Sequence, residues 1–135
     1  MKKEYVLYKK ILAELNLHFV FCTKFRRKIF SKEEGAKECF RKAALAEFEK
    51  LGVKPTNIEC KDEYVHIYAQ CPLDVTVSKI LTSVKRTTSA ALKSEVLNLD
   101  EHASVWTWNA LVATDATFEE TDIQEYLMMQ KKRTS

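Results

Sequence analysis

Segments with strand spacing and segments with helix spacing alternate along this chain, and their order restricts the fold more than any other feature. Large apolar side chains occupy every second position from Leu17 to Phe21, which predicts a strand over 17–22 with one face inward. Residues 32–51 then carry apolar residues at helical spacing until Gly52. Ser31 and Glu34 resemble a capping box, so we expect a helix there.

Two further strands and a second helix follow. Residues 53–60 and 64–71 are rich in residues typical of strands and are separated by three polar residues, which predicts a hairpin that ends at Pro72. Apolar residues recur at helical spacing from 75 to 97, which predicts a long second helix.

The last third of the chain predicts one more strand and a closing helix. Residues 105–114 return to strand character. Thr117 and Glu120 form a second capping-box signature, and the helix that follows should fray near 131–135. The resulting order, βαββαβ plus an added C-terminal helix, is the α+β ferredoxin-like plan that RRM modules share. Its antiparallel sheet should carry helices on one face.

Length and composition indicate one domain. A chain of 135 residues with 46% hydrophobic content buries roughly 70% of its unfolded surface, so residues 1–135 should form a single domain with a real core. The stretch 1–15 and the tail 131–135 are expected to be peripheral.

Charge and cysteine usage exclude several classes of protein. The net charge of +3 gives no strong polycationic field, so any affinity for nucleic acid must come from local clusters. No apolar run is long enough to span a membrane or to serve as a signal peptide, and we expect a cytoplasmic protein. The four cysteines lack CxxC spacing, which favours reduced, small apolar residues over disulfides or a zinc site.

Four polar side chains could carry chemistry. Tyr64 and His66 lie two apart on a predicted strand and therefore leave the same face. Tyr126 and Gln130 are spaced i, i+4 and therefore stack one turn apart on the last helix. Taken alone, each has an ordinary structural explanation, such as a surface histidine or an aromatic residue that touches the core.

The order of five segments gives these residues a specific context. The chain resembles the HUH-type single-tyrosine transposases of small insertion sequences and their REP-associated relatives over nearly its whole length. The segments that carry the resemblance are LHFVFCTKFRRKIF at 17–30, EYVHIYAQCP at 63–72, KRTTSAALK at 85–93, VWTWNALVAT at 105–114 and EYLMMQ at 125–130.

The resemblance implies roles for the polar residues. In that family two histidines of one strand and a glutamine of the last helix hold a divalent metal ion, Mg²⁺ or Mn²⁺. A tyrosine of that helix attacks single-stranded DNA and leaves a 5′-phosphotyrosine. By this resemblance His66 and Gln130 are metal ligands and Tyr126 is the catalytic nucleophile.

Tyr64 stands at the position of the first histidine of the motif. A neutral phenol is a poor ligand for these ions, so metal binding should be weakened. Two outcomes are open: a carboxylate of Asp62 or Glu63 substitutes, or the site is weakened or dead. The chain also has Asp115, Ala116 and Thr117 where the family tends to have a glycine-rich turn, and Lys85–Arg86 where it usually has Lys-Gly.

Basic residues form two groups that could bind a DNA backbone. They are expected to contact phosphates together with hydroxyl groups, while Phe25 stacks on a base. Either group on its own would be read as a solvated surface. The predicted DNA-binding residues are Lys24, Arg26, Arg27, Lys85, Arg86 and Thr88, with Lys28, Thr87 and Ser89 beside them.

The remaining aromatic and histidine residues are assigned structural roles. His18 should make hydrogen bonds in the core or behind the metal ligands. His102 should be solvated, and Trp106 and Trp108 should pack in the core or a dimer interface.

The sequence therefore predicts a DNA-binding transposase-family protein, implied by the resemblance to be a homodimer, that acts on single-stranded or hairpin DNA ends in DNA transposition. One alternative is a non-catalytic, decayed or repurposed single-stranded nucleic-acid-binding dimer. A ferredoxin-like oligomer that acts on a small molecule or a protein is a third reading, for which the sequence has no motif.

Overall fold

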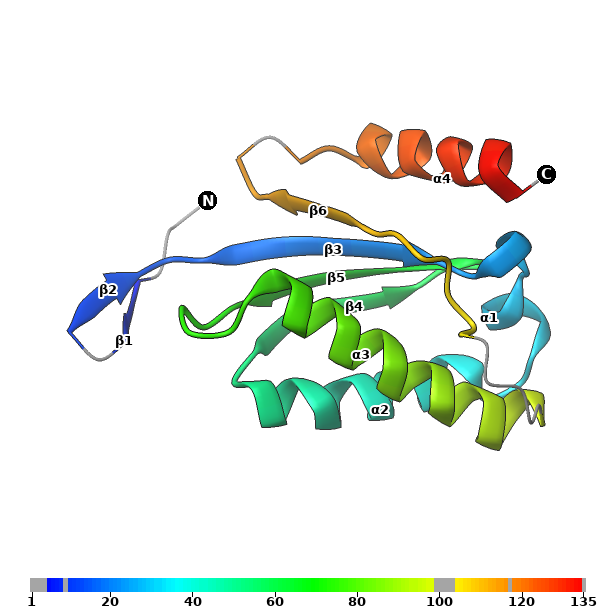
Figure 1. Cartoon of the computed structure of the whole chain (residues 1–135), viewed down its shortest axis with the longest axis horizontal. Helices are drawn as coiled ribbons and strands as arrows, with labels where there is room; N and C mark the ends of the chain where they lie inside the picture. The colour runs from blue at the N-terminus through cyan, green and yellow to red at the C-terminus, as the bar shows by residue number, and fades with distance from the viewer. Residues whose placement is uncertain (1–4, 9, 99–103, 117, 135) are drawn as a thin grey trace.

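The protein has a four-stranded antiparallel sheet with helices on both faces (Figure 1). The computed structural model describes residues 5–8, 10–98, 104–116 and 118–134, excluding the side chains of Tyr8 and of residues 131–134. The sheet has the strand order β4-β5-β3-β6. Its strands are β3 (Asn16–Cys22), β4 (Lys54–Cys60), β5 (Tyr64–Gln70) and β6 (Leu111–Thr114).

The pairing of β3 sets the register of the sheet. β3 runs antiparallel to β5 from Asn16↔Gln70 to Cys22↔Tyr64, and to β6 from Leu17↔Thr114 to Val20↔Leu111. Because neighbouring residues of a strand point to opposite faces, Phe19 lies on one face and His18 on the other. This order and pairing confirm the predicted ferredoxin-like fold.

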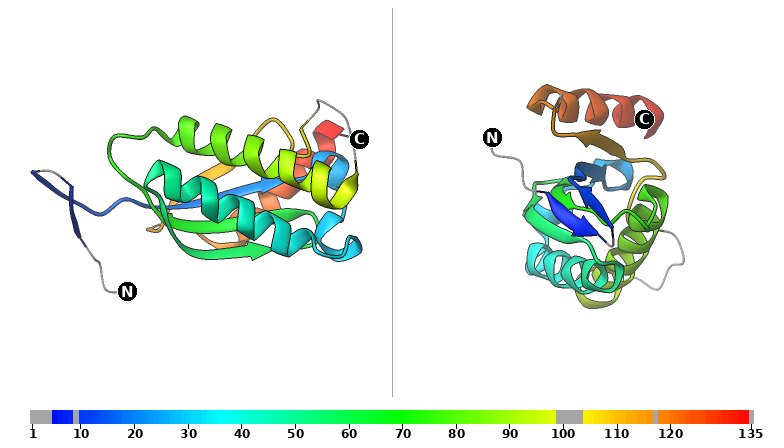
Figure 2. Two further views of the ribbon diagram at one scale, coloured as in Figure 1. Left: turned by 90° about the horizontal axis from the view of Figure 1, so that it is seen from below. Right: turned by 90° about the vertical axis from the view of Figure 1, so that its left-hand side faces the viewer.

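Two long helices cover the first face. α2 (Ala36–Leu51) and α3 (Val77–Leu92) lie together beneath the sheet (Figures 1 and 2). Burial of large side chains there gives the main hydrophobic core, at roughly 25 cal/mol for each Å² of apolar surface removed from water. The largest of these side chains are Phe19, Phe21, Phe40, Phe48 and Trp106.

The closing helix α4 (Glu120–Thr134) covers the opposite face (Figure 1). Its Ile123, Tyr126 and Leu127 pack against Val20, Cys22 and Tyr64 in a second buried cluster. The sheet is therefore covered by helices on both faces, whereas the sequence predicted helices on one face. α4 brings Tyr126 onto the face that carries His18 and His66.

The predicted helix over 32–51 is α2, which begins later than predicted, at Ala36, and a separate short helix precedes it. α1 (Ile29–Lys32) is separated from α2 by Gly35, which has φ +82° and precedes α2. The Ser31–Glu34 capping box is not formed, because the Ser31 hydroxyl donates to the carbonyl of Lys28. Gly52 ends α2 in a left-handed conformation (φ +77°), as predicted.

The second predicted helix, over 75–97, is confirmed, but its last residues form a π-helix and not an α-helix. The Thr76 side chain caps α3 by accepting a hydrogen bond from the Lys79 amide. A short π-helical segment, η2 (Lys93–Leu97), continues α3.

The predicted strand over 105–114 is too long. Only β6 is a strand, and Trp106 forms an isolated bridge with Thr23. The segment from Thr107 to Asn109 is irregular, and the hydroxyl of Tyr126 forms hydrogen bonds to it. In the capping box predicted before α4, Thr117 lies outside the described residues. The Glu119 amide instead donates to Asp122 at 2.8 Å, near the start of α4.

The N-terminal stretch contains a hairpin that the sequence did not predict. β1 (Val6–Tyr8) pairs with β2 (Ile11–Ala13), and the hairpin projects from the body of the molecule (Figure 2). No helix among the described residues is long and apolar enough to cross a bilayer. His102 lies outside the described residues.

Candidate active site and nucleic-acid interface

Tyr126 points into a buried polar corner between α4 and the segment before β6. Its hydroxyl donates to the carbonyl of Asn109 at 3.3 Å and lies 3.5 Å from the hydroxyl of Thr107. Burial raises the pKa of Tyr126 well above that of an exposed tyrosine, and the nearby Cys22 thiol adds to the shift. In this position the phenol is protonated and its oxygen faces protein, not solvent.

Lys85 of α3 binds the same irregular segment before β6, from the opposite face of the sheet. Its ammonium donates to the carbonyls of Thr107 at 2.6 Å and Asn109 at 3.1 Å, and it lies 5.8 Å from the centre of the Phe21 ring. Burial lowers the pKa of Lys85 to about 8. Lys85 is therefore an internal cation that holds the segment to which Tyr126 is bonded.

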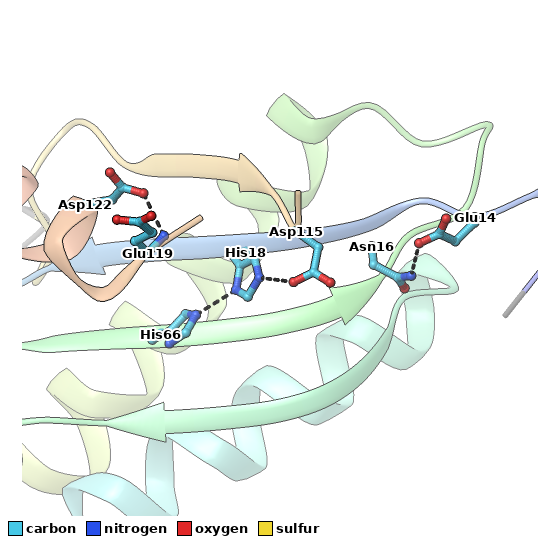
Figure 3. A network of polar contacts seen from close by, with 7 residues as sticks. All are labelled: Glu14, Asn16, His18, His66, Asp115, Glu119 and Asp122. Atoms are coloured by element: carbon cyan, nitrogen blue, oxygen red, sulfur yellow. Dashed lines mark hydrogen bonds and ion pairs between the residues drawn. The ribbon is translucent and has the colours of Figure 1, made fainter. Parts of the chain in front are cut away.

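His66 belongs to a chain of three polar side chains on the α4 face of the sheet (Figure 3). Its Nε2 lies 2.9 Å from Nδ1 of His18, and Nε2 of His18 lies 3.0 Å from the Asp115 carboxylate. Burial, and then repulsion from His18, lower the pKa of His66, whereas the hydrogen bond from His18 lowers the pKa of Asp115. The hydrogen-bonded role predicted for His18 is confirmed.

Aromatic rings hold this chain in place. The His18 ring stacks on Phe118 at 4.0 Å and on Tyr68 at 4.4 Å, and the His66 ring lies 5.1 Å from Phe118. The two imidazoles therefore have restricted orientations before any ligand binds.

Tyr64 does not join the imidazoles. Its side chain is 8% exposed and packs in the apolar cluster with Val20, Cys22 and the buried face of α4. Burial raises the pKa of Tyr64, with added repulsion from Glu120 and other nearby carboxylates. The phenol of Tyr64 is thus a neutral packing residue.

The predicted metal ligands His66 and Gln130 lie on different elements, β5 and α4. Across residues 5–8, 10–98, 104–116 and 118–134, no three His, Cys, Asp or Glu side chains gather in a way that could hold one. Gln130 is buried one turn beyond Tyr126 on α4, away from the end of the helix near Phe118 that faces His66. Metal binding by His66 and Gln130 remains a prediction.

The loop after β3 presents an aromatic ring with basic neighbours. The short helix η1 (Lys24–Arg26) is tied down by Thr23, whose amide and hydroxyl donate to Glu63 and whose hydroxyl also donates to Arg27. Phe25 and Arg26 have positive φ values of 58° and 51°, a conformation that costs about 1–3 kcal/mol for such residues. This conformation leaves the Phe25 side chain 65% exposed.

The basic residues around Phe25 differ in their exposure and in their contacts within the protein. Arg27 is exposed and lies 6.0 Å over the Phe25 ring, while Lys28 is exposed and Lys24 is half-buried. Arg26 forms an ion pair with Glu63 at 3.3 Å. Phosphate contact by these side chains remains a prediction that their exposure permits.

The second predicted DNA-binding group is corrected in part. Thr88 is fully buried, where its hydroxyl donates to Val84 and accepts from the indole of Trp106, so it cannot reach a phosphate. Lys85 is directed inward, as described above. The neighbouring hydroxyls of Thr87 and Ser89 are also used inside the protein, by Glu47 and by the amide of Val105. Arg86 alone of the named α3 residues is exposed.

Several residues of the site escaped sequence reasoning. Asp115 was read as a departure from a glycine-rich turn, and Thr107 and Asn109 carry no recognisable motif. The two tryptophans also differ, since Trp106 is buried in the core as predicted but Trp108 is 74% exposed. The described cysteines are free thiols, as expected.

Comparisons with known proteins identify a family and similar folds. The family model described as "Transposase IS200 like" matches residues 11–130. A transposase candidate from Deinococcus radiodurans R1 superposes with a TM-score of 0.80 at 19% identity, over 96% of this chain and 98% of its own. A REP-associated tyrosine transposase bound to a REP hairpin gives 0.57 at 13% identity, over 90% and 67%. No curated protein is significantly similar in sequence.

Proposed function

This chain belongs to the IS200-like transposase family, and we propose that it binds folded single-stranded DNA ends and acts on them in transposition. A transposase role follows from the family. Single-stranded hairpin DNA as the substrate is supported by the structural relative whose name states a bound REP hairpin. The observation that carries the proposal is the loop of residues 23–28, which holds the exposed Phe25 beside Arg27 and Lys28.

That loop has the composition of a surface for single-stranded DNA. Stacking of a base on an aromatic ring contributes about 1–3 kcal/mol and tolerates any base, while cations beside the ring bind the backbone. Thr23 and the Arg26–Glu63 ion pair hold the loop, so the ring is positioned before DNA arrives. Arg86 adds a second exposed cation on α3.

Cleavage is assigned to Tyr126. Its oxygen forms a bond to phosphorus as the bond from phosphorus to the 3′ oxygen breaks, which leaves a 5′-phosphotyrosine. The proton of the phenol is balanced by the proton that the 3′ oxygen gains. The hydroxyl must first leave Asn109, so α4 has to shift or act on the site of the partner subunit in a homodimer.

A non-catalytic nucleic-acid-binding dimer is the second candidate, and Tyr64 is the observation that favours it. A buried phenol stands where the resemblance places an imidazole, and no three described His, Cys, Asp or Glu side chains of one chain could hold a metal ion. In this case the fold and the DNA-binding loop are kept without strand cleavage.

The test is incubation of the full chain with labelled hairpin-bearing single-stranded DNA, with Mn²⁺ or with EDTA. We expect retarded complexes, and with Mn²⁺ a covalent protein–DNA band that Tyr126→Phe removes. Retardation without a covalent band would establish the non-catalytic candidate. The absence of binding even at low salt would refute both and favour the third reading of the sequence.

A further inference from the structure

The indole of Trp108 is 74% exposed, although the two residues before it, Trp106 and Thr107, are buried. We propose that Trp108 is a second base-stacking residue for single-stranded DNA and that the exposed Arg86 of α3 binds the DNA backbone beside it. This inference rests on the proposed function and deepens it, because it adds a DNA-binding residue to the segment that holds the hydroxyl of Tyr126.

The main chain on both sides of Trp108 is fixed by hydrogen bonds. The Thr107 amide donates to the carbonyl of Cys22 at 2.9 Å. The Lys85 ammonium donates to the carbonyls of Thr107 and Asn109, one on each side of Trp108. Since its neighbours are already held, Trp108 loses little main-chain freedom when a base stacks on the indole, and the entropy cost of binding is low.

Trp108 and Phe25 extend from the same stretch of paired backbone. Thr23 and Trp106 form an antiparallel bridge. Phe25 comes two residues after Thr23, and Trp108 comes two residues after Trp106, so the antiparallel pairing places the two rings toward opposite ends of this stretch. Their Cα atoms are roughly 10–15 Å apart, at about 2.0 Å per residue in η1 and about 3.3 Å per residue in extended chain. A stacked strand of DNA advances about 3.4 Å per nucleotide, so about three or four nucleotides connect the two rings.

Arg86 supplies a cation where the segment of Trp108 meets α3. It follows Lys85, whose hydrogen bonds join the two elements, and its side chain is exposed. α3 contains Lys79, Lys85 and Arg86 and no acidic residue. A phosphate beside Trp108 therefore meets positive charge from α3 and no carboxylate of that helix.

An unpaired base is the partner that fits Trp108. Bases inside a duplex stem are already stacked on their neighbours, whereas an unpaired base can place its face on an aromatic ring. Stacking also accepts any base. Trp108 should therefore add affinity for the single-stranded part of a ligand without adding sequence preference.

The experiment measures binding of the full chain to a hairpin with a single-stranded extension, to the same hairpin with an abasic extension, and to the blunt hairpin. Trp108→Ala should bind the first ligand about 5- to 150-fold more weakly, which is the loss expected for one stacked base, and should bind the other two like the natural chain. Trp108→Phe keeps a ring and should retain most of the affinity. Tyr5→Ala is the matched control, because Tyr5 is also an exposed aromatic residue but lies beside β1, at the opposite end of β3 from α1 (Figure 1).

Tryptophan fluorescence provides an independent measurement. A stacked base quenches an indole, and the chain has two tryptophans, of which Trp106 is buried. We expect saturable quenching when the extended hairpin is added to the natural chain, and no quenching in Trp108→Phe. Circular dichroism establishes that each variant is folded.

Natural affinity of folded Trp108→Ala for the extended hairpin, or an equal loss with the abasic extension, would overturn this inference while the proposed function stands. Sedimentation of the DNA-free chain tests the other possible partner of the ring. A changed oligomeric state in Trp108→Ala would mean that the indole contacts a second copy of the chain and not a base. If the natural chain binds none of the three ligands, the proposed function is refuted as well.

Discussion

Tyr126 and Lys85 meet at one main-chain carbonyl, that of Asn109, with distances of 3.3 Å from the phenol oxygen and 3.1 Å from the ammonium nitrogen. They approach it from α4 and α3, which lie on opposite faces of the sheet. The irregular segment before β6 is therefore the physical link between the closing helix and the main core. The cleavage proposed for Tyr126 requires that its hydroxyl break this link.

Tyr126→Phe should change the stability of the protein at alkaline pH. The raised pKa of Tyr126 means that the unfolded chain loses this proton near pH ~10 while the folded chain keeps it. The unfolded state then binds fewer protons, so the free energy of unfolding falls as pH rises above about 10. We expect the variant to lack this part of the fall in urea titrations across that range. Tyr5→Phe is the control, since that side chain is largely exposed, and an equal change in both variants would contradict the prediction.

Lys85→Met should change the pH dependence of stability in the opposite direction, and it should also lower the free energy of unfolding. The pKa of Lys85 is about 8 in the folded chain and near ~10.4 when unfolded, so stability rises with pH between these values in the natural chain. The variant should lack that rise. It also removes the Lys85 donor from the carbonyl of Thr107, whereas the carbonyl of Asn109 keeps its hydrogen bond from Tyr126; we expect a loss of about 1–3 kcal/mol.

The double variant of Lys85→Met and Tyr126→Phe tests whether the two residues act through Asn109. Residues that share one hydrogen-bonding partner usually show a coupling energy of about 0.5–3 kcal/mol. Additive losses in urea unfolding would mean that the shared carbonyl has no energetic consequence.

Thr88 and Arg86 lie two residues apart on α3, but substitutions at the two positions should have opposite effects on stability and on DNA affinity. Thr88→Val deprives the Trp106 indole of its acceptor and should lower stability by about 1–3 kcal/mol without changing affinity for hairpin DNA. Arg86→Ala should leave stability within about 0.5 kcal/mol and weaken DNA binding, most strongly at low salt. Thermal unfolding and gel retardation measure the two effects, and a DNA-binding defect in stable Thr88→Val would contradict the burial argument.

The contrast between these residues shows where sequence reasoning stops. The period-two pattern of Leu17 to Phe21 predicted β3, because a half-buried strand has to alternate. Lys85 donates to the carbonyls of Thr107 and Asn109, and Thr88 accepts from the Trp106 indole; these partners come from an irregular segment about 20 residues later. No local pattern encodes that contact, so exposed DNA ligands were expected where tertiary hydrogen bonds are found.

The contact between Asp115 and His18 was not predicted for the same reason: no local sequence pattern encodes it. In sequence Asp115 is a single polar residue at a turn, and the pairing of β3 with β6, in which Ala113 lies opposite His18, brings it to His18. Tyr126 and His66 are predicted site residues because the segments that carry them resemble those of a family, but their separation within one chain depends on the docking of α4.

Phe25→Ala should weaken binding of single-stranded hairpin DNA without affecting the fold. The ring is exposed, so its removal costs little stability, but the loss of one stacked base corresponds to roughly 5- to 150-fold in affinity. Phe25→Tyr keeps the ring and is the matched control.

Arg27→Ala should instead lower the salt dependence of binding, by a slope of about 0.7 for one phosphate contact on a single strand. Fluorescence anisotropy at several salt concentrations measures both, and equal affinities for Phe25→Ala and the control would exclude stacking.

Tyr64→His combines a cost in stability with a gain in metal affinity. The side chain is buried among Val20, Cys22 and Leu127, so a smaller polar ring should destabilise the fold by about 1–3 kcal/mol. The new imidazole leaves the same strand face as His66 and adds a ligand to that face of the sheet. We expect Co²⁺ or Mn²⁺ to bind at least tenfold more tightly than to the natural chain, by the magnitude that changes near a metal typically have. Tyr64→Phe is the control, because it keeps the packing and offers no ligand. If both variants bind these ions alike, tyrosine at position 64 is not what limits metal binding, and the loss has to be sought in the placement of α4.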